Sequence, residues 1–202
     1  MSGERELTAK GLATRERIVE YAAAVTRERG AANTRMECVR VAANVSNSQL
    51  FHYFPQGKAE MMVAVARYEA RTILADQESR LRATRTWRAW DEWSEALYAH
   101  YEENGTRCGL AALLGQLDQD APEVRDVLAG LLEAWERVVA DGIRAMQSAR
   151  KIDPGLDADT MAGTIVTGVI GGIVMMTVTG STSRLRTTLR ASIATLRGAA
   201  RQ

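Results

Sequence analysis

The stretch VSNSQLFHYFPQGK (residues 45–58) holds both phenylalanines of this 202-residue chain and one of its two histidines. Ser46 and Gln49 fit the S-x-x-Q capping box, in which two side chains satisfy backbone N–H groups at a helix start. We therefore expect a short helix over residues 47–54. Isolated short helices are marginal, so Phe51 and Phe54 are expected to hold it in the core.

Two helices are predicted before this one, over residues 14–29 and 35–43. Thr34 and Glu37 fit a second capping box, T-x-x-E, at the start of the latter. Asn44 stands between the two short helices, and asparagine tolerates the positive φ that turns a chain sharply after a helix. Two short helices joined by a tight turn after a longer helix predict a helix-turn-helix unit.

The second helix of such a unit presents its first residues to base edges in the major groove. Here these residues are Asn47, Ser48 and Gln49, which are polar and able to donate and accept hydrogen bonds. Glutamine suits a bidentate contact with adenine, so Gln49 is the leading candidate to read a base. His52, Tyr53 and Lys58 are expected to follow on the same side and hold phosphates.

Residues 14–62, TRERIVEYAAAVTRERGAANTRMECVRVAANVSNSQLFHYFPQGKAEMM, resemble the amino-terminal domain of the TetR family of transcriptional repressors. The likeness lies in a Thr-Arg pair, an apolar first helix, a Val-Ser turn and a Leu-aromatic-x-aromatic-Phe recognition helix. It implies an all-α homodimer of about nine helices, with a helix-turn-helix domain over residues 1–57. A helical-bundle domain for ligand binding and dimerisation is expected over residues 58–202, with the last two helices forming the dimer interface.

The resemblance also implies a set of residues that contact double-stranded DNA. They are Thr14, Thr34, Arg35, Arg40, Ser46, Asn47, Ser48, Gln49, His52, Tyr53 and Lys58. Arg40 stands where the family usually has alanine between two crossing helices, so its stem must extend outward or its charge must find a partner. Asn44 replaces the usual glycine.

Composition and charge suit a soluble, cytoplasmic protein. Residues 1–58 carry nine Lys/Arg against six Asp/Glu, and the remainder carries seventeen against nineteen, which is compatible with phosphate binding at one end. The first ten residues contain no apolar run typical of a secretory signal. Cys38 and Cys108 lie 70 positions apart and read as free thiols. We expect no metal ion and no cofactor.

Trp90, Trp93, Leu97 and Tyr101 recur at 3-4-4 spacing and share one face of a helix predicted over residues 87–103. One interpretation is ordinary core. The other is a pocket for a small, largely apolar or aromatic effector, since pockets in helical bundles form between helices. Further candidates for its walls are Tyr68, His100, Leu114, Trp135 and Met175.

Residues 160–183 form an uncharged run of 24 residues, and a bilayer span needs about 20. Gly168 and Gly172 form a G-x-x-x-G pair that lets helices approach closely. A helix that is apolar all round can equally be buried in a bundle, and the resemblance favours a dimer helix.

Three functions remain open: a ligand-responsive DNA-binding regulator, a regulator anchored in a membrane through residues 160–183, and a thiol-dependent enzyme using Cys108 and His100. The enzyme hypothesis lacks a third orienting residue and a Gly-rich phosphate loop. We expect a repressor that is not an enzyme and that binds a palindromic operator. Binding of the effector is expected to release the repressor from the operator.

Overall fold

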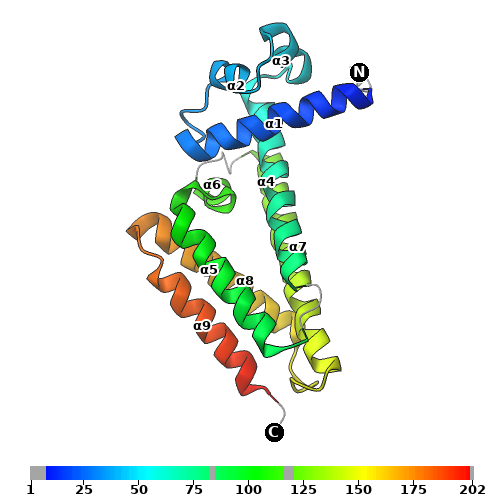
Figure 1. The fold of residues 1–202 in the computed structure, drawn as a ribbon, viewed down its shortest axis with the longest axis vertical. Coiled ribbons are helices and arrows are strands. Elements are labelled where there is room, and N and C mark those ends of the chain that lie inside the picture. Colours follow the sequence, from blue (N-terminus) through cyan, green and yellow to red (C-terminus); the bar gives the residue numbers. More distant parts are fainter. Residues whose placement is uncertain (1–7, 82–84, 116–120, 201–202) are drawn as a thin grey trace.

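The computed structural model describes residues 8–81, 85–115 and 121–200 and is all-α there, as predicted (Figure 1). Within these ranges the extended structure is limited to an isolated bridge between Ile152 and Ala200. The helices in chain order are α1 (Ala9–Arg29), α2 (Met36–Ala42), α3 (Asn47–Tyr53), α4 (Lys58–Leu81), α5 (Trp87–Asn104), the 3-10 turn η1 (Gly105–Arg107), α6 (Gly109–Gly115), α7 (Pro122–Ser148), α8 (Ala158–Thr179) and α9 (Ser183–Gly198).

The helix-turn-helix unit consists of α1, α2 and α3, which lie together at one end of the molecule (Figure 1). Its core is formed by Ile18, Val39, Leu50 and Phe54, whose side chains are all fully buried. Helix α1 begins five residues earlier than predicted, because the Thr8 hydroxyl accepts the Gly11 N–H and caps it there.

The Ser46–Gln49 capping box is confirmed in both directions. The Gln49 N–H donates to Ser46 Oγ at 3.1 Å, and the Ser46 N–H donates to Gln49 Oε1 at 3.0 Å. Asn44 has a φ of +50°, which is the left-handed conformation expected for the turn. The sequence therefore predicted the start of α3 and its cause.

The second predicted capping box, between Thr34 and Glu37, is absent. The residue before α2 is Arg35, which makes no side-chain cap bond. Thr34 is buried, and its hydroxyl donates instead to the carbonyl of Gly30 at 2.9 Å. Glu37 is ion-paired with Arg40, so the motif is satisfied by other partners.

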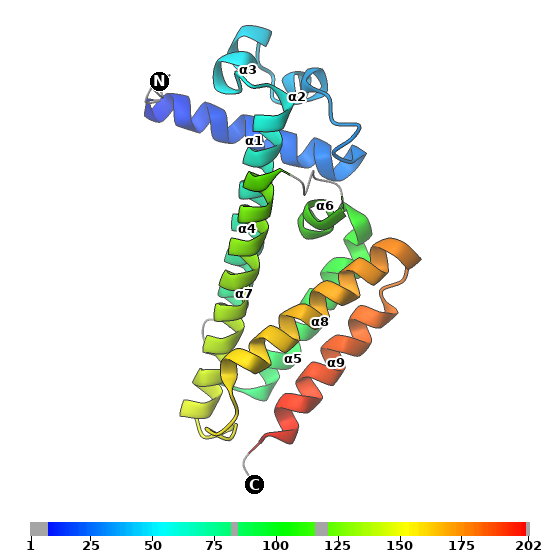
Figure 2. The same ribbon diagram turned by 180° about the vertical axis from the view of Figure 1, so that it is seen from behind.

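The rest of the molecule is a helical bundle. Helices α4 and α7 lie side by side and form a column that ends beneath the helix-turn-helix unit (Figures 1 and 2). Helix α8 packs against α7 on one side and α9 on the other, while α5 also packs against α9. Helices α5 and α8 begin at side-chain caps: the Thr86 hydroxyl accepts the Ala89 N–H, and the Asp157 carboxylate accepts the Asp159 and Thr160 N–H groups.

The glycine pair of α8 brings α9 of the same chain close. A Cβ on Gly172 would lie 2.8 Å from the Cα of Leu185, and one on Gly168 would lie 2.6 Å from the Thr188 methyl group. The sequence predicts that these glycines allow close approach of helices in a dimer helix. The partner helix that they admit is α9 within the subunit, so the pair is explained without a second chain.

Helix α8 is the one described helix that is long and apolar enough to cross a membrane by length and composition. Ala162, Ile165 and Val169 along it are fully buried in the bundle. Apolar residues are needed there to form the core between α7 and α9, which is the alternative that the sequence left open.

Candidate functional site

The solvent face of α3 carries a run of polar side chains. Asn47, Ser48, Gln49 and His52 are exposed, whereas Leu50 on the same helix is buried. The buried side of α3 packs against the core of the unit, and the side chains at its amino-terminal end remain exposed to solvent. This arrangement brings together the residues that were predicted to read bases.

Gln49 has a second task in this structure. Its Oε1 accepts the Ser46 N–H, so the amide NH₂ is the part that remains available for a base. The bidentate adenine contact predicted for Gln49 needs both amide atoms, and would require the side chain to leave the capping box.

The aromatic cluster divides differently from the prediction. Phe54 is fully buried as expected, but Phe51 is 48% exposed and is not a core residue. In an α-helix, residues four positions apart share a face, so Leu50 and Phe54 point inward together and Phe51 is rotated away. Tyr53 is half-buried and packs against the core, and its ring contacts His52 edge-on at 5.0 Å.

Thr34 requires a correction as a DNA-contact candidate, because its side chain is fully buried and bonded to α1 and the following turn. Arg35 is exposed beside it. Arg40 extends outward, as its unusual position demanded, and donates from Nε to Glu37 Oε2 at 2.9 Å. Thr14 is half-buried, with its hydroxyl donating to the carbonyl of Lys10.

Two cations at the base of the unit have structural contacts. Lys58 Nζ donates to the carbonyl of Ala32 at 3.2 Å and so ties the start of α4 to the turn after α1. The Arg15 guanidinium lies 5.0 Å from the centre of the Phe54 ring, a cation–π contact that supports the inner side of α3. Arg15 belongs to the Thr-Arg pair of the sequence motif, but this contact had no signal in the sequence.

The interior aromatic face is packed as core. The side chains of Trp90, Trp93, Leu97, Tyr101 and Trp135 are all buried. Trp90 and Trp93 meet edge-to-face with ring centres 5.6 Å apart. Their predicted co-location is confirmed, and their role in ligand binding stays a prediction.

Polar groups within this interior are unevenly satisfied. The Trp93 indole N–H donates to Gln77 Oε1 at 2.8 Å, and Gln77 is itself buried. The indole nitrogens of Trp90 and Trp135 are buried and have no hydrogen-bond partner among the residues that the structure describes. Because an unpaired buried donor is unfavourable, these two N–H groups are the points in the interior where an acceptor would be stabilised.

The remaining predicted pocket residues do not line that interior equally. His100 and Met175 are exposed. The His100 ring meets the buried Tyr101 ring edge-on, with ring centres 5.3 Å apart, so His100 lies at the rim of the aromatic interior and not inside it. Leu114 is half-buried against the core. Tyr68 lies on another face, in a cavity of about 1120 Å³ between α1, α4 and the start of α7. That cavity includes no other predicted ligand residue.

Cys108 and His100 do not form a nucleophile and base. The thiol is buried, its sulfur accepts the Ala111 N–H at 3.3 Å, and burial raises the pKa of Cys108 above its ordinary value. An activated thiol needs a lowered pKa. Burial likewise raises the pKa of Tyr101 well above its ordinary value, with the neighbouring Cys108 adding to the effect. In the described ranges, no cluster of three or more His, Cys, Asp or Glu side chains could hold a metal ion.

Sequence comparison matches residues 79–192 to a family model described as the tetracyclin repressor-like C-terminal domain. No curated protein matches the chain by sequence. The match covers more than half of the chain and lies entirely outside the helix-turn-helix stretch.

Solved structures resemble the whole fold. A TetR-family transcriptional regulator from Cytophaga hutchinsonii aligns with a TM-score of 0.77 at 18% identity, covering 98% of this chain and 100% of that one. A TetR transcriptional regulator from Chloroflexus aurantiacus gives 0.74 at 18% identity, covering 96% and 99%. A complex of SmeT with triclosan gives 0.68 at 16% identity, covering 94% and 92%.

Proposed function

This chain belongs to the TetR family of transcriptional regulators, and on that premise we propose that it binds a palindromic DNA operator as a homodimer and is released by a small, largely apolar or aromatic effector. The observation that carries the proposal is α3, a capped helix with Asn47, Ser48 and Gln49 exposed at its amino-terminal end. We place the boundary between the DNA-binding domain and the ligand-binding domain at residues 57 and 58, where α4 begins.

The DNA interface that we propose divides into two kinds of contact. Asn47, Ser48 and the amide NH₂ of Gln49 would meet base edges, while other polar side chains around the unit would hold phosphates. The phosphate-contacting residues would be Thr14, Arg35, Arg40, Ser46, His52, Tyr53 and Lys58. The buried Thr34 has no part in this interface.

The dimer would form through α8 and α9. In support, Val174, Met175 and Val178 on α8 are exposed apolar side chains near one end of that helix. A contiguous apolar surface of this kind is typical of a protein interface. Met175, which the sequence analysis assigned to the ligand pocket, fits this role better because it faces solvent.

The effector would bind in the interior around Trp90, Trp93 and Trp135. The unpaired indole N–H groups of Trp90 and Trp135 favour a ligand with an aromatic or apolar body and a hydrogen-bond acceptor such as a carbonyl or ether oxygen. A protein of this fold has been solved in complex with triclosan, which supports a small-molecule role for the bundle. We further propose a cytoplasmic location, since α8 is used to build the bundle core.

Selection of bound duplexes from a random pool tests the DNA part of the proposal. We expect the selected sites to have two-fold symmetry, with one half-site per subunit. Full-affinity binding of a monomer to one asymmetric half-site would contradict it. The effector part is tested by titrating candidate ligands against tryptophan fluorescence with and without operator. Linkage requires that operator weaken a true inducer by the factor by which the inducer weakens operator binding.

A further inference from the structure

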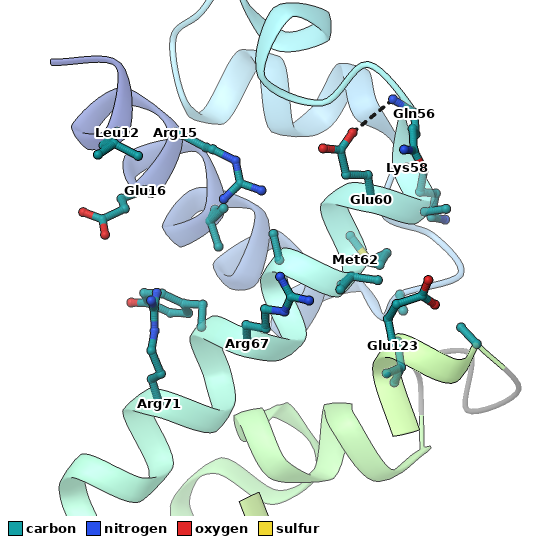
Figure 3. Close-up of a pocket in the computed structure, with 18 of the residues that line it drawn as sticks. Leu12, Arg15, Glu16, Gln56, Lys58, Glu60, Met62, Arg67, Arg71 and Glu123 are labelled. Atoms are coloured by element: carbon teal, nitrogen blue, oxygen red, sulfur yellow. Dashed lines mark hydrogen bonds between the residues drawn. The ribbon is translucent and has the colours of Figure 1, made fainter. Parts of the chain in front are cut away.

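The cavity of about 1120 Å³ between α1, α4 and the start of α7 lies outside the aromatic interior (Figure 3). It is placed where α1 crosses α4, and Figure 1 shows this crossing at the end of the α4–α7 column that supports the helix-turn-helix unit. None of the four tryptophans lines it. The cavity is therefore a second candidate binding site, separate from the proposed effector site, and we call it the α1–α4 cavity.

One part of the α1–α4 cavity is apolar. Val19 of α1, Met62 of α4 and Val124 of α7 are buried side chains that contribute to its wall. Val63 and Tyr68 of α4 line it as well and are half-buried. Three helices thus supply an apolar surface. A ligand that buries a hydrocarbon chain or a ring against this surface would gain binding free energy.

Three arginines supply positive charge to the same space. Arg67 and Arg71 are one turn apart on α4, and Arg15 reaches in from α1; Figure 3 shows Arg15 and Arg67 extending into the cavity from opposite sides. Among the described residues, no carboxylate forms an ion pair with any of the three. Guanidinium groups bind carboxylate and phosphate through paired, charge-assisted hydrogen bonds.

The other charged groups of the lining are placed differently. Glu60 accepts the Gln56 N–H at 3.0 Å, and Lys58 is bonded to the Ala32 carbonyl. Figure 3 shows Glu60 and Glu123 at the side of the cavity away from Arg71, and Glu16 at its outer edge. The space between Arg15 and Arg67 is therefore the part of the cavity that favours a negative charge.

We propose that the α1–α4 cavity binds an amphiphile with one anionic head group, a carboxylate or a phosphate ester. Arg15 and Arg67 hold the head group, and the apolar portion lies against Val19, Met62 and Val63. Arg71 stands beside the site and adds to its positive potential. Because Arg15 belongs to α1 and Arg67 to α4, the head group joins the helix-turn-helix unit to the bundle.

Calorimetric titration of the full chain, without DNA, tests this proposal with four probes below their aggregation concentrations. They are dodecanoate, dodecyl phosphate, dodecanol and inorganic phosphate. We expect at least one of the two anionic amphiphiles to bind with one molecule per chain, and the one that binds more tightly identifies the preferred head group. Dodecanol and inorganic phosphate should each bind at least tenfold more weakly, since each lacks one half of the recognised chemistry.

Arg15→Gln and Arg67→Gln should each lower the affinity for the bound amphiphile at least tenfold. Arg17→Gln is the matched control, because Arg17 is an exposed arginine on α1 that does not line the cavity, and it should leave the affinity unchanged. Circular dichroism of each variant verifies that the helices are intact. Equal binding of dodecanol and dodecanoate, absence of binding by both anions, or full binding by the two cavity variants would overturn the proposal.

Tryptophan fluorescence separates this site from the proposed effector site. A probe in the α1–α4 cavity should leave the emission of the interior tryptophans nearly unchanged, whereas an interior ligand should quench it. Strong quenching by dodecanoate that survives Arg67→Gln would move the binding to the interior and refute the α1–α4 site. The experiment uses no DNA, so its failure leaves the proposed operator binding untouched.

Discussion

The buried carboxylate of Glu69 on α4 is ion-paired with the guanidinium of Arg27 on α1, 42 positions earlier in the chain. The Glu69 side chain is 5% exposed and that of Arg27 is 33% exposed. Gly109, the first residue of α6, lies directly against the carboxylate, and a Cβ there would collide with it. The pair therefore joins the helix-turn-helix unit to the bundle at the point where α6 also meets α4.

Arg27→Ala should destabilise the protein by about 1 to 3 kcal/mol. The substitution leaves a buried carboxylate without its partner, and the effect is below that of a fully buried pair because Arg27 is partly solvated. Urea unfolding at pH 7 measures it. The control is Arg88→Ala, which removes the exposed Arg88–Glu92 pair of α5 and should leave stability nearly unchanged. Equal effects of the two substitutions would show that burial of Glu69 contributes nothing.

Glu69 should also make stability depend on pH. Burial raises the pKa of Glu69 above its ordinary value of 4.5, against the opposing effect of Arg27. At a pH between the ordinary pKa of the unfolded state and the raised pKa of the folded state, the folded state holds more protons than the unfolded state. The stability of the protein therefore falls as pH rises through this range. Glu69→Gln should flatten this decline in unfolding experiments from pH 4 to pH 8.

Asp157 provides a comparison of opposite sign. Hydrogen bonds from Thr160, first the hydroxyl and then the backbone N–H, lower the pKa of Asp157 below its ordinary value of 3.8. Its contribution is therefore present above pH 3.8 and lost as pH falls through the lowered pKa. The asparagine of an Asp157→Asn variant can still cap α8 but does not titrate, so this substitution should make the loss of stability on acidification smaller.

For Glu69, the contradicting result is a Glu69→Gln variant whose stability declines with pH as steeply as that of the wild type. The decline could then not be assigned to Glu69.

The glycines of α8 offer a matched pair of substitutions. Gly172→Ala should cost about 1 to 3 kcal/mol, because the new methyl group would meet the backbone of Leu185 and push α9 away. Gly171→Ala meets no neighbouring atom among the described residues of its own subunit, so it should instead raise the stability of the subunit by about 0.5 to 1 kcal/mol through helix propensity. Thermal unfolding of both variants measures the difference. If both were stabilising, the close approach of α8 and α9 would be wrong.

Gln49 should affect operator preference more than overall affinity. Gln49→Ala removes both the cap acceptor for Ser46 and the amide donor, and the single hydrogen bond to a base that is lost is worth about 0.5 to 1.5 kcal/mol. Gln49→Glu keeps an acceptor for the Ser46 N–H but replaces the donor by a second acceptor. We expect the alanine variant to relax the preference at one base step and the glutamate variant to change it. Selection of bound duplexes for each variant measures both outcomes, and unchanged preference in both would remove Gln49 from the base contacts.

Local sequence signals predicted the start of α3 and the turn before it, although the equally local capping box of Thr34 and Glu37 is absent. Ser46 with Gln49 specifies a cap and Asn44 specifies a turn through their own backbone contacts, and both were found as expected. The error at Phe51 was one of phase, because two phenylalanines three positions apart were both assigned to the inner face. Leu50 is buried on the inner face, and of the two phenylalanines only Phe54, four positions later, lies on that face with it.

Long-range relationships had no comparable signal. The Thr34 side chain is constrained by α1, and the Thr188 methyl group of α9 leaves no room for a side chain at Gly168. The spacing of these residues in the sequence reveals neither contact. Arg27 and Glu69 meet only because α1 crosses α4. The same crossing creates the α1–α4 cavity, whose lining combines three helices. Candidate residues for the DNA interface could be predicted because they lie on one short helix, whereas those of a pocket depend on how helices pack.

The bridge between Ile152 and Ala200 has a practical consequence for experiments on this molecule. The Asp153 N–H donates to the Ala199 carbonyl at 2.9 Å, so the chain after α9 is held against the loop between α7 and α8. That point lies at the end of the molecule farthest from α3 (Figure 1). A fluorophore or a surface attachment introduced there would not interfere with the recognition helix. Distances measured from such a fluorophore would start from a point that the bridge holds in place.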